Sequence, residues 1–177
     1  MIIAKALEEV LKDILIQYQY NSEFVNAGSQ FHFGSQLELN KWIIDKNNRQ
    51  LEKYPLIWYV LEKSNDVKGM SGYKETYARL ILFQATDKFW FNDQRTAETY
   101  LKVLEPLFEK IKERLLSNPY ISIITENGYK QFEDEDFPNY GTEQEFNGSK
   151  GEQITLDPVD AKVIDFHLRI NPQCIIK

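Results

Sequence analysis

Apolar residues recur at three- and four-residue spacing in two stretches of the chain, which is the period of an amphipathic helix. The first stretch predicts a helix over residues 2–19, with charged side chains on the opposite face. The second predicts the longest helix, over residues 93–117. Its apolar stripe consists of Tyr100, Leu101, Leu104, Leu107, Phe108, Ile111 and Leu115. Pro106 lies within this pattern and lacks an N–H, so it should bend or divide the helix.

Four other stretches carry the patterns of β-strands. Residues 56–61 are apolar on both faces, as in an interior strand, and a polar loop joins them to a second strand near residues 76–86. Residues 120–125 predict a further strand, and an Asn-Gly pair after it is the signal of a two-residue hairpin turn. The last predicted strand, residues 161–170, alternates. Ile164, Phe166, Leu168 and Ile170 face one way, and Asp165, His167 and Arg169 face the other.

The remaining segments are polar or rich in turn residues. Residues 21–36 should be irregular, and the capping-box spacing of Ser35 and Glu38 predicts a short helix to about Asp45. Residues 62–75 and 133–153 should form long loops. The order of elements predicts one domain over residues 1–177, of the α+β class. Its helices, including the N-terminal helix and the long helix, should pack on one face of a mostly antiparallel sheet.

Composition narrows the classes of function. The 177 residues suit one domain with a sizeable core. A net charge of −6 argues against a protein that coats nucleic acid, because phosphate binding needs clustered Lys and Arg. The single Cys174 cannot form an internal disulfide. The sequence shows no signal-peptide apolar region and no apolar run near the roughly 20 residues that span a bilayer, so we expect cytoplasmic synthesis and no membrane partner.

The chain offers little material for catalysis. Asp165 and His167 share one strand face and could be two members of a hydrolase triad, but no G-x-S-x-G elbow supplies the serine. A polar strand face is the favoured interpretation. Cys174 has no identifiable base beside it, and His32 is expected to be a partly buried loop histidine. No catalytic residue is therefore predicted, and the protein is not expected to be an enzyme.

An acidic run is the one cluster with the chemistry of a metal site. It consists of Glu133, Asp134, Glu135 and Asp136, whose oxygens could bind a hard cation. The spacing does not match an EF-hand loop, and an acidic run is usually a solvated loop. We therefore predict no metal site and no cofactor.

Two further groups have simple structural interpretations. Lys110, Lys112 and Arg114 lie near the end of the long helix and should complement its dipole. Trp90 lies between two Phe residues and should anchor the core or the start of the helix. Stacking of Trp90 on nucleic-acid bases is not favoured, because basic residues do not surround it.

Three segments, with the order of elements, carry a resemblance to a known family. They are YPLIWYVLE (54–62), ARLILFQATDKFWFNDQRTAETYLKVLEPLFEKIKERL (78–115) and DAKVIDFHLRI (160–170). They resemble a strand that starts with Tyr-Pro, then a central strand with an aromatic turn and a long helix, and then a closing strand that starts with Asp. The chain is similar to the ring-forming tail-terminator and head–tail connector proteins of tailed bacteriophages, in versions common in phages of Bacteroidetes-like hosts.

This resemblance implies a virion structural protein of the neck or tail that assembles as a ring, six- or twelvefold. Its partners would be copies of itself, adjacent connector, portal-side or tail proteins, and DNA that passes through the lumen without sequence-specific binding. An acidic subunit would suit such a channel, because it repels phosphate. The two long loops should contact neighbouring subunits. The expected contact residues are Asp66, Lys68, Tyr73, Glu133, Asp134, Glu135, Asp136 and Tyr140.

Two alternatives from other classes remain open. One is a small cytoplasmic hydrolase or nuclease that uses carboxylates in residues 133–145. The other is an acidic binding module such as an immunity protein, which the net negative charge would also allow.

Overall fold

The computed structural model describes residues 2–20, 23–49, 52–61, 73–125, 131–140 and 158–175. The helices in these ranges are α1 (Ile2–Leu11), α2 (Gln36–Asn48), α3 (Asn92–Arg95), the π-helix η1 (Thr96–Leu104), α4 (Glu105–Ser117) and α5 (Pro172–Ile175). The strands are β1 (Leu15–Tyr20), β2 (Glu23–Gly28), β3 (Gln30–Gly34), β4 (Leu56–Val60), β5 (Lys74–Ala85), β6 (Ile121–Ile123), β7 (Glu133–Phe137) and β8 (Val159–Ile170).

The main sheet has the order β3-β4-β5-β8-β6, and β7 also pairs with β8. Only β3 and β4 run parallel among the described pairs. β5 and β8 are the longest strands and pair from Lys74 opposite Ile170 to Ala85 opposite Val159. β1 and β2 form a separate antiparallel hairpin. The prediction of an α+β fold with a mostly antiparallel sheet is confirmed.

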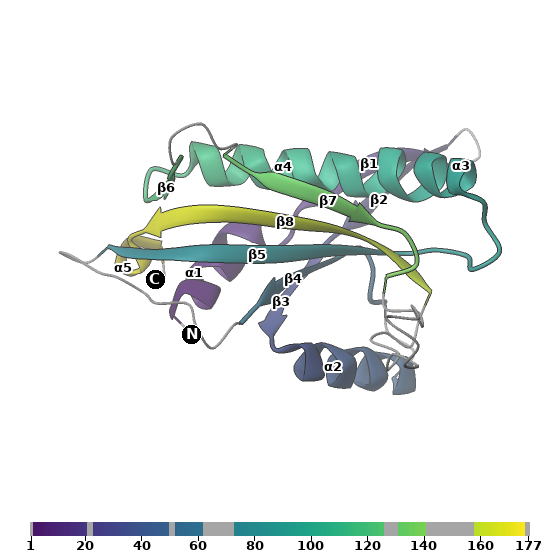
Figure 1. The fold of residues 1–177 in the computed structure, drawn as a ribbon, viewed down its shortest axis with the longest axis horizontal. Coiled ribbons are helices and arrows are strands. Elements are labelled where there is room, and N and C mark those ends of the chain that lie inside the picture. Colours follow the sequence, from purple (N-terminus) through teal and green to yellow (C-terminus); the bar gives the residue numbers. More distant parts are fainter. Residues whose placement is uncertain are drawn as a thin grey trace, which may run out of the picture.

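The two faces of the sheet carry different helices (Figure 1). Leu80 and Leu82 of β5 point into a core shared with α1, η1 and α4. Ile81 and Phe83 of the same strand point into a smaller core that contains Leu39 and Ile43 of α2. The prediction that the helices lie on one face holds for α1 and the long helix. It is wrong for α2, because the strand pattern that we interpreted as doubly apolar needs cover on both faces.

The long helix is continuous from α3 through η1 to α4, close to the predicted residues 93–117. The N–H of Glu105 bonds to the carbonyl of Tyr100, the five-residue spacing of a π-helix. Pro106 lies directly after the π-helical segment ends, so its missing N–H falls where the hydrogen-bond spacing changes from five residues to four. The wider π turn directs Tyr100 and Leu104 to the sheet and leaves Leu101 62 % exposed, so Leu101 is wrongly placed in the predicted stripe.

The N-terminal region differs from its prediction. α1 ends at Leu11, and Asp13 has a left-handed backbone with φ of 56° before β1 begins. From Ile14 the apolar positions alternate, since Ile14 and Ile16 are buried and Leu15 is 66 % exposed. That period of two is the strand period, which we interpreted as helical. The segment predicted as irregular forms β2 and β3, whereas the short helix predicted after Ser35 is confirmed as α2.

The edge beside β8 also corrects two predictions. β6 and β7 both run antiparallel to β8, so they point the same way and do not form a hairpin with each other. The Asn-Gly turn itself lies outside the described residues. Residues 133–137, predicted as part of a loop, are strand β7. Among the described helices, none combines the length and apolarity that crossing a membrane requires.

Candidate functional site

The acidic run lies on β7, where neighbouring residues face opposite sides of the sheet. Asp134 and Asp136 face the long helix, where the side chain of Lys162 is 2 % exposed. The Lys162 ammonium lies 2.8 Å from Asp136 Oδ1, 3.0 Å from Asp134 Oδ2 and 2.9 Å from Glu105 Oε1. Each of its three N–H groups therefore has one carboxylate partner.

The three carboxylates determine the charge of Lys162. Burial alone would lower its pKa, but hydrogen bonds to Asp136, Glu105 and Asp134 outweigh burial and raise the pKa above its ordinary value. The ammonium occupies the position between these carboxylates that a bound cation would take. In the part of the chain that the structure describes, no group of three or more His, Cys, Asp or Glu side chains has the arrangement of a metal site.

The other two acids of the run, Glu133 and Glu135, face the opposite side of the sheet. They lie across from Asp165 and Val163 of β8 in the strand register. With Arg79, Phe137 and Tyr140 they help to line an open groove of about 500 Å³. Tyr140 packs edge-on against Phe83 at 5.3 Å between ring centroids, and burial raises its pKa. The structure thus brings Tyr140 together with Glu133 and Glu135.

The remaining predicted contact residues are not part of this groove. Tyr73 is 45 % exposed just before β5, at the level of Ile170, whereas β7 pairs with residues 161–165 of β8. Asp66 and Lys68 lie outside the described residues.

Asp165 and His167 lie on the face that the alternation predicts, but their contacts are with β5. Arg79 donates two hydrogen bonds to the Asp165 carboxylate, both of 2.8 Å. His167 stacks on Tyr77 with ring centroids 4.3 Å apart and an interplanar angle of 18°. The geometry is that of cross-strand pairs on a polar sheet face.

A buried network at the start of β8 was not predicted from the sequence. Arg95 and Asp160 are 2 % and 0 % exposed, and Arg95 Nη1 lies 2.6 Å from Asp160 Oδ1. The Thr99 hydroxyl donates to Asp160 Oδ2 at 2.7 Å, and the backbone N–H of Asn139 donates to Oδ1 at 3.0 Å. The carboxylate is therefore fully compensated by an opposite charge and two further donors.

The same arginine fixes the loop before the long helix. Arg95 Nη2 donates to the carbonyl of Asp87 at 2.8 Å, and Nε donates to that of Trp90 at 3.1 Å. Trp90 is half-buried but belongs to neither hydrophobic core, and its backbone carbonyl, not its ring, bonds to Arg95. Its neighbours Phe89 and Phe91 are 77 % and 80 % exposed. The loop therefore holds two large aromatic side chains in solvent on a rigid base.

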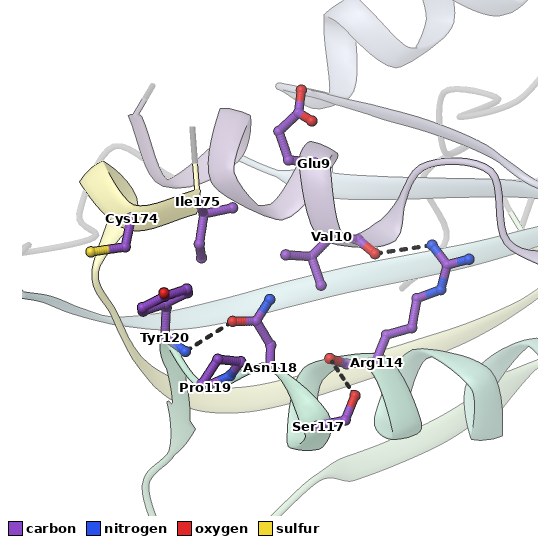
Figure 2. A pocket seen from close by; sticks show the side chains of 9 residues that line it. All are labelled: Glu9, Val10, Arg114, Ser117, Asn118, Pro119, Tyr120, Cys174 and Ile175. Carbon is purple, nitrogen blue, oxygen red and sulfur yellow. Dashed lines mark hydrogen bonds between the residues drawn. The ribbon is translucent and has the colours of Figure 1, made fainter. Parts of the chain in front are cut away.

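A second groove lies at the other end of the long helix (Figure 2). Its volume is about 630 Å³, and its lining includes Val10, Tyr120, Cys174 and Ile175. Arg114 donates to the carbonyls of Val10 at 3.1 Å and Lys12 at 2.7 Å. Arg114 therefore complements the C-terminus of α1, a role that the sequence does not reveal.

His32 lies on strand β3 rather than in the predicted loop, and it is partly buried as expected. Its ring lies 4.6 Å from that of Trp42 and 6.5 Å from that of Trp58, measured between centroids. Burial and the nearby charge of Lys46 lower the pKa of His32, so its neutral form is favoured.

The sequence contains one signal for the buried charged residues that it did not predict. By strand alternation Asp160 and Lys162 share the face of Ile164 and Phe166, which points to the core. A charged residue at a core position requires a buried partner. The sequence could have indicated that partners exist, but it could not identify Arg95 or Glu105 as those partners.

A comparison with protein-family models and with curated protein sequences found no match. The class that the structure defines is an α+β protein with a six-stranded, mostly antiparallel sheet covered by one long helix. Its described surface features are an acidic edge strand, a rigid aromatic loop and a groove at the opposite end of that helix.

Proposed function

We propose that this protein is a structural subunit that assembles with copies of itself into a ring, as a head–tail connector or tail terminator of a bacteriophage. The observation that carries the proposal is the large apolar side chains that the single chain leaves in solvent. The most exposed of these, at 62–80 %, are Leu15, Phe24, Leu37, Tyr77, Phe89, Phe91 and Leu101. Where exposed apolar groups are neighbours, as Phe89 and Phe91 are, they mark surfaces that partners cover.

The distribution of these side chains favours contact on more than one side. Leu15 and Phe24 lie on the same face of the β1–β2 hairpin, because Phe24 pairs with Gln19 and Leu15 with Gly28. Phe89 and Phe91 lie on a different element, before the long helix. Two different contact surfaces that fit each other join subunits head to tail, and such a chain closes into a ring when the rotation between neighbours allows it.

The resemblance of residues 54–62, 78–115 and 160–170 to tail-terminator and connector proteins supports the viral setting. The acidic groove is compatible with it, since Glu133 and Glu135 would repel phosphate if they faced the lumen. The nuclease alternative is less well supported, because Lys162 already engages Asp134 and Asp136.

Negative-stain electron microscopy of the purified protein tests the proposal. Closed rings of uniform diameter with a central channel are the expected result. Single compact particles at every protein concentration would refute ring assembly. If an antibody against the protein does not label the neck or tail of purified phage particles, the location in the virion is refuted.

A further inference from the structure

The loop before the long helix is built to hold two phenylalanines in one arrangement. The backbone N–H of Phe89 donates to Asp87 Oδ1 at 2.9 Å, and that of Trp90 donates to the Asp87 carbonyl at 3.1 Å. The N–H of Phe91 donates to Gln94 Oε1 at 3.1 Å. Rigid aromatic side chains with little conformational entropy to lose are typical anchors of protein interfaces. We call Asp87–Phe91 the aromatic knob.

The groove of Figure 2 has fixed walls of matching character. Val10, Pro119, Tyr120 and Ile175 supply apolar surface. Its backbone is held by hydrogen bonds from the N–H of Tyr120 to Asn118 Oδ1 at 2.9 Å and from the N–H of Asn171 to the Tyr120 carbonyl at 3.0 Å. A preformed groove of about 630 Å³ is large enough to receive aromatic side chains.

The knob precedes α3 and the groove is lined by residues 117–120, so the two lie at opposite ends of the long helix. Figure 1 shows α3 at one end of this helix and β6 at the other. α3 follows the knob directly, and Ser117 at the end of α4 lines the groove. At about 1.5 Å per residue the helix separates them by roughly 35–40 Å. The knob therefore cannot reach the groove of its own chain. Only a second molecule can bring the two together, and a contact between opposite ends is head-to-tail.

The helix ends give the two features opposite partial charges. The knob lies at the positive N-terminal end of the long helix, and its exposed Asp87 and Lys88 carry opposite charges. The groove lies at the negative C-terminal end of α4 and carries Glu9, which also pairs with Lys12 at 2.7 Å. The C-terminus of α1 is already complemented by Arg114. Docking in this direction brings the N-terminus of one long helix to the C-terminus of the next.

We infer that Phe89 and Phe91 of one subunit occupy the groove between α1, α4 and α5 of the next copy of the same chain. This contact rests on the proposed ring and specifies its subunit interface. Two phenylalanines bury about 150–250 Å² each, less than the roughly 800 Å² per partner of a stable interface. They are thus the anchors of a larger contact.

The chain carries its own reporter for this contact, because its single cysteine, Cys174, is exposed in the groove. Phe89→Cys and Phe91→Cys variants would be treated with a short bis-maleimide and run on denaturing gels. A ladder of covalent oligomers from both variants is expected. The matched control is Leu37→Cys, which replaces a 63 % exposed residue on α2 and should give no ladder. Adding Cys174→Ala to Phe91→Cys should abolish the ladder.

A second variant tests the contact without cross-linking. Phe89→Ser with Phe91→Ser should leave the circular dichroism spectrum of the folded chain unchanged, because both side chains are exposed, but should lower the mass in solution to that of one chain. If the double serine variant still forms rings and the two cysteine variants give no ladder, the knob contact is overturned and ring assembly stands. A wild-type protein that is monomeric at every concentration would overturn both. An equal ladder from Leu37→Cys would show random collision and overturn the contact.

Discussion

Two charged networks join β8 to the long helix, and they differ in how much water reaches them. In the first, Arg95, Thr99 and Asp160 are all buried, and Arg95 also binds the carbonyls of Asp87 and Trp90 in the loop before the long helix. In the second, only Lys162 is buried, and the side chains of Glu105, Asp134 and Asp136 are 38 %, 35 % and 47 % exposed. The first network stabilises the interior and fixes the loop that carries Phe89 and Phe91. The second leaves its acids at the surface, where a partner could meet them.

The largest effect on the free energy of unfolding is expected from breaking the first network, that of Arg95 and Asp160. Arg95→Met would leave the Asp160 carboxylate buried without its cation, at a cost of about 3–5 kcal/mol in the free energy of unfolding. It would also release the carbonyls of Asp87 and Trp90, so the aromatic knob should loosen. Urea denaturation measures the first effect. A loss below about 1 kcal/mol would show that Asp160 does not depend on this pair.

The second network should tolerate the loss of Lys162 better than the first network tolerates the loss of Arg95. Lys162→Met keeps the buried stem, and its carboxylates can regain water, so we expect a loss of about 1–3 kcal/mol. The same urea titration measures it. A loss larger than that of Arg95→Met would contradict the comparison, because it would show that exposure of the partners does not soften the effect.

The pH dependence of stability provides a further test of the second network. Because the folded state raises the pKa of Lys162, this group contributes stability that is complete below its ordinary pKa of 10.5 and is lost as pH rises through the folded value. The wild type should therefore lose its stability advantage over Lys162→Met above about pH 10.5. Parallel melting curves for the two proteins across the alkaline range would contradict this assignment.

Within the acidic run, substitutions on one face of β7 should affect assembly, and substitutions on the other face should affect stability. Glu133→Lys with Glu135→Lys changes the exposed groove and should alter the free energy of unfolding by about 0.5 kcal/mol or less, while disrupting ring assembly. The matched change on the other face, Asp134→Asn with Asp136→Asn, removes two partners of Lys162 and should lower stability. Circular dichroism melts and electron microscopy of both pairs would distinguish them; equal behaviour would contradict the two-sided assignment.

The smallest effect is expected from an ion pair in solvent. Arg79 and Asp165 are 47 % and 41 % exposed, so Arg79→Met should cost about 0–1 kcal/mol. This variant is also the control for Arg95→Met, because both changes remove an arginine paired with β8. A loss as large as that of Arg95→Met would mean that burial does not decide the strength of these pairs.

The sequence pattern predicts elements well where one period dominates. The long helix, β4, β5 and β8 follow from their apolar positions, and the polar face of Asp165 and His167 follows from alternation. β1 was missed because Ile14, Leu15 and Tyr18 continue the helical spacing of the preceding residues, whereas the buried residues are Ile14 and Ile16, which alternate. β7 was missed because four consecutive acids resemble a solvated loop, whereas in the structure they pair with β8 and two of them bind the buried Lys162. Such partners are distant in sequence, so no local pattern can identify them.

The central claim is that the exposed aromatic and acidic surfaces serve assembly of identical subunits. Size-exclusion chromatography with multi-angle light scattering tests it most directly. The account predicts one species whose mass is six or twelve times the 20.9 kDa of a single chain, in the wild type and not in Phe89→Ser with Phe91→Ser. A wild-type mass of 20.9 kDa at every protein concentration would contradict it.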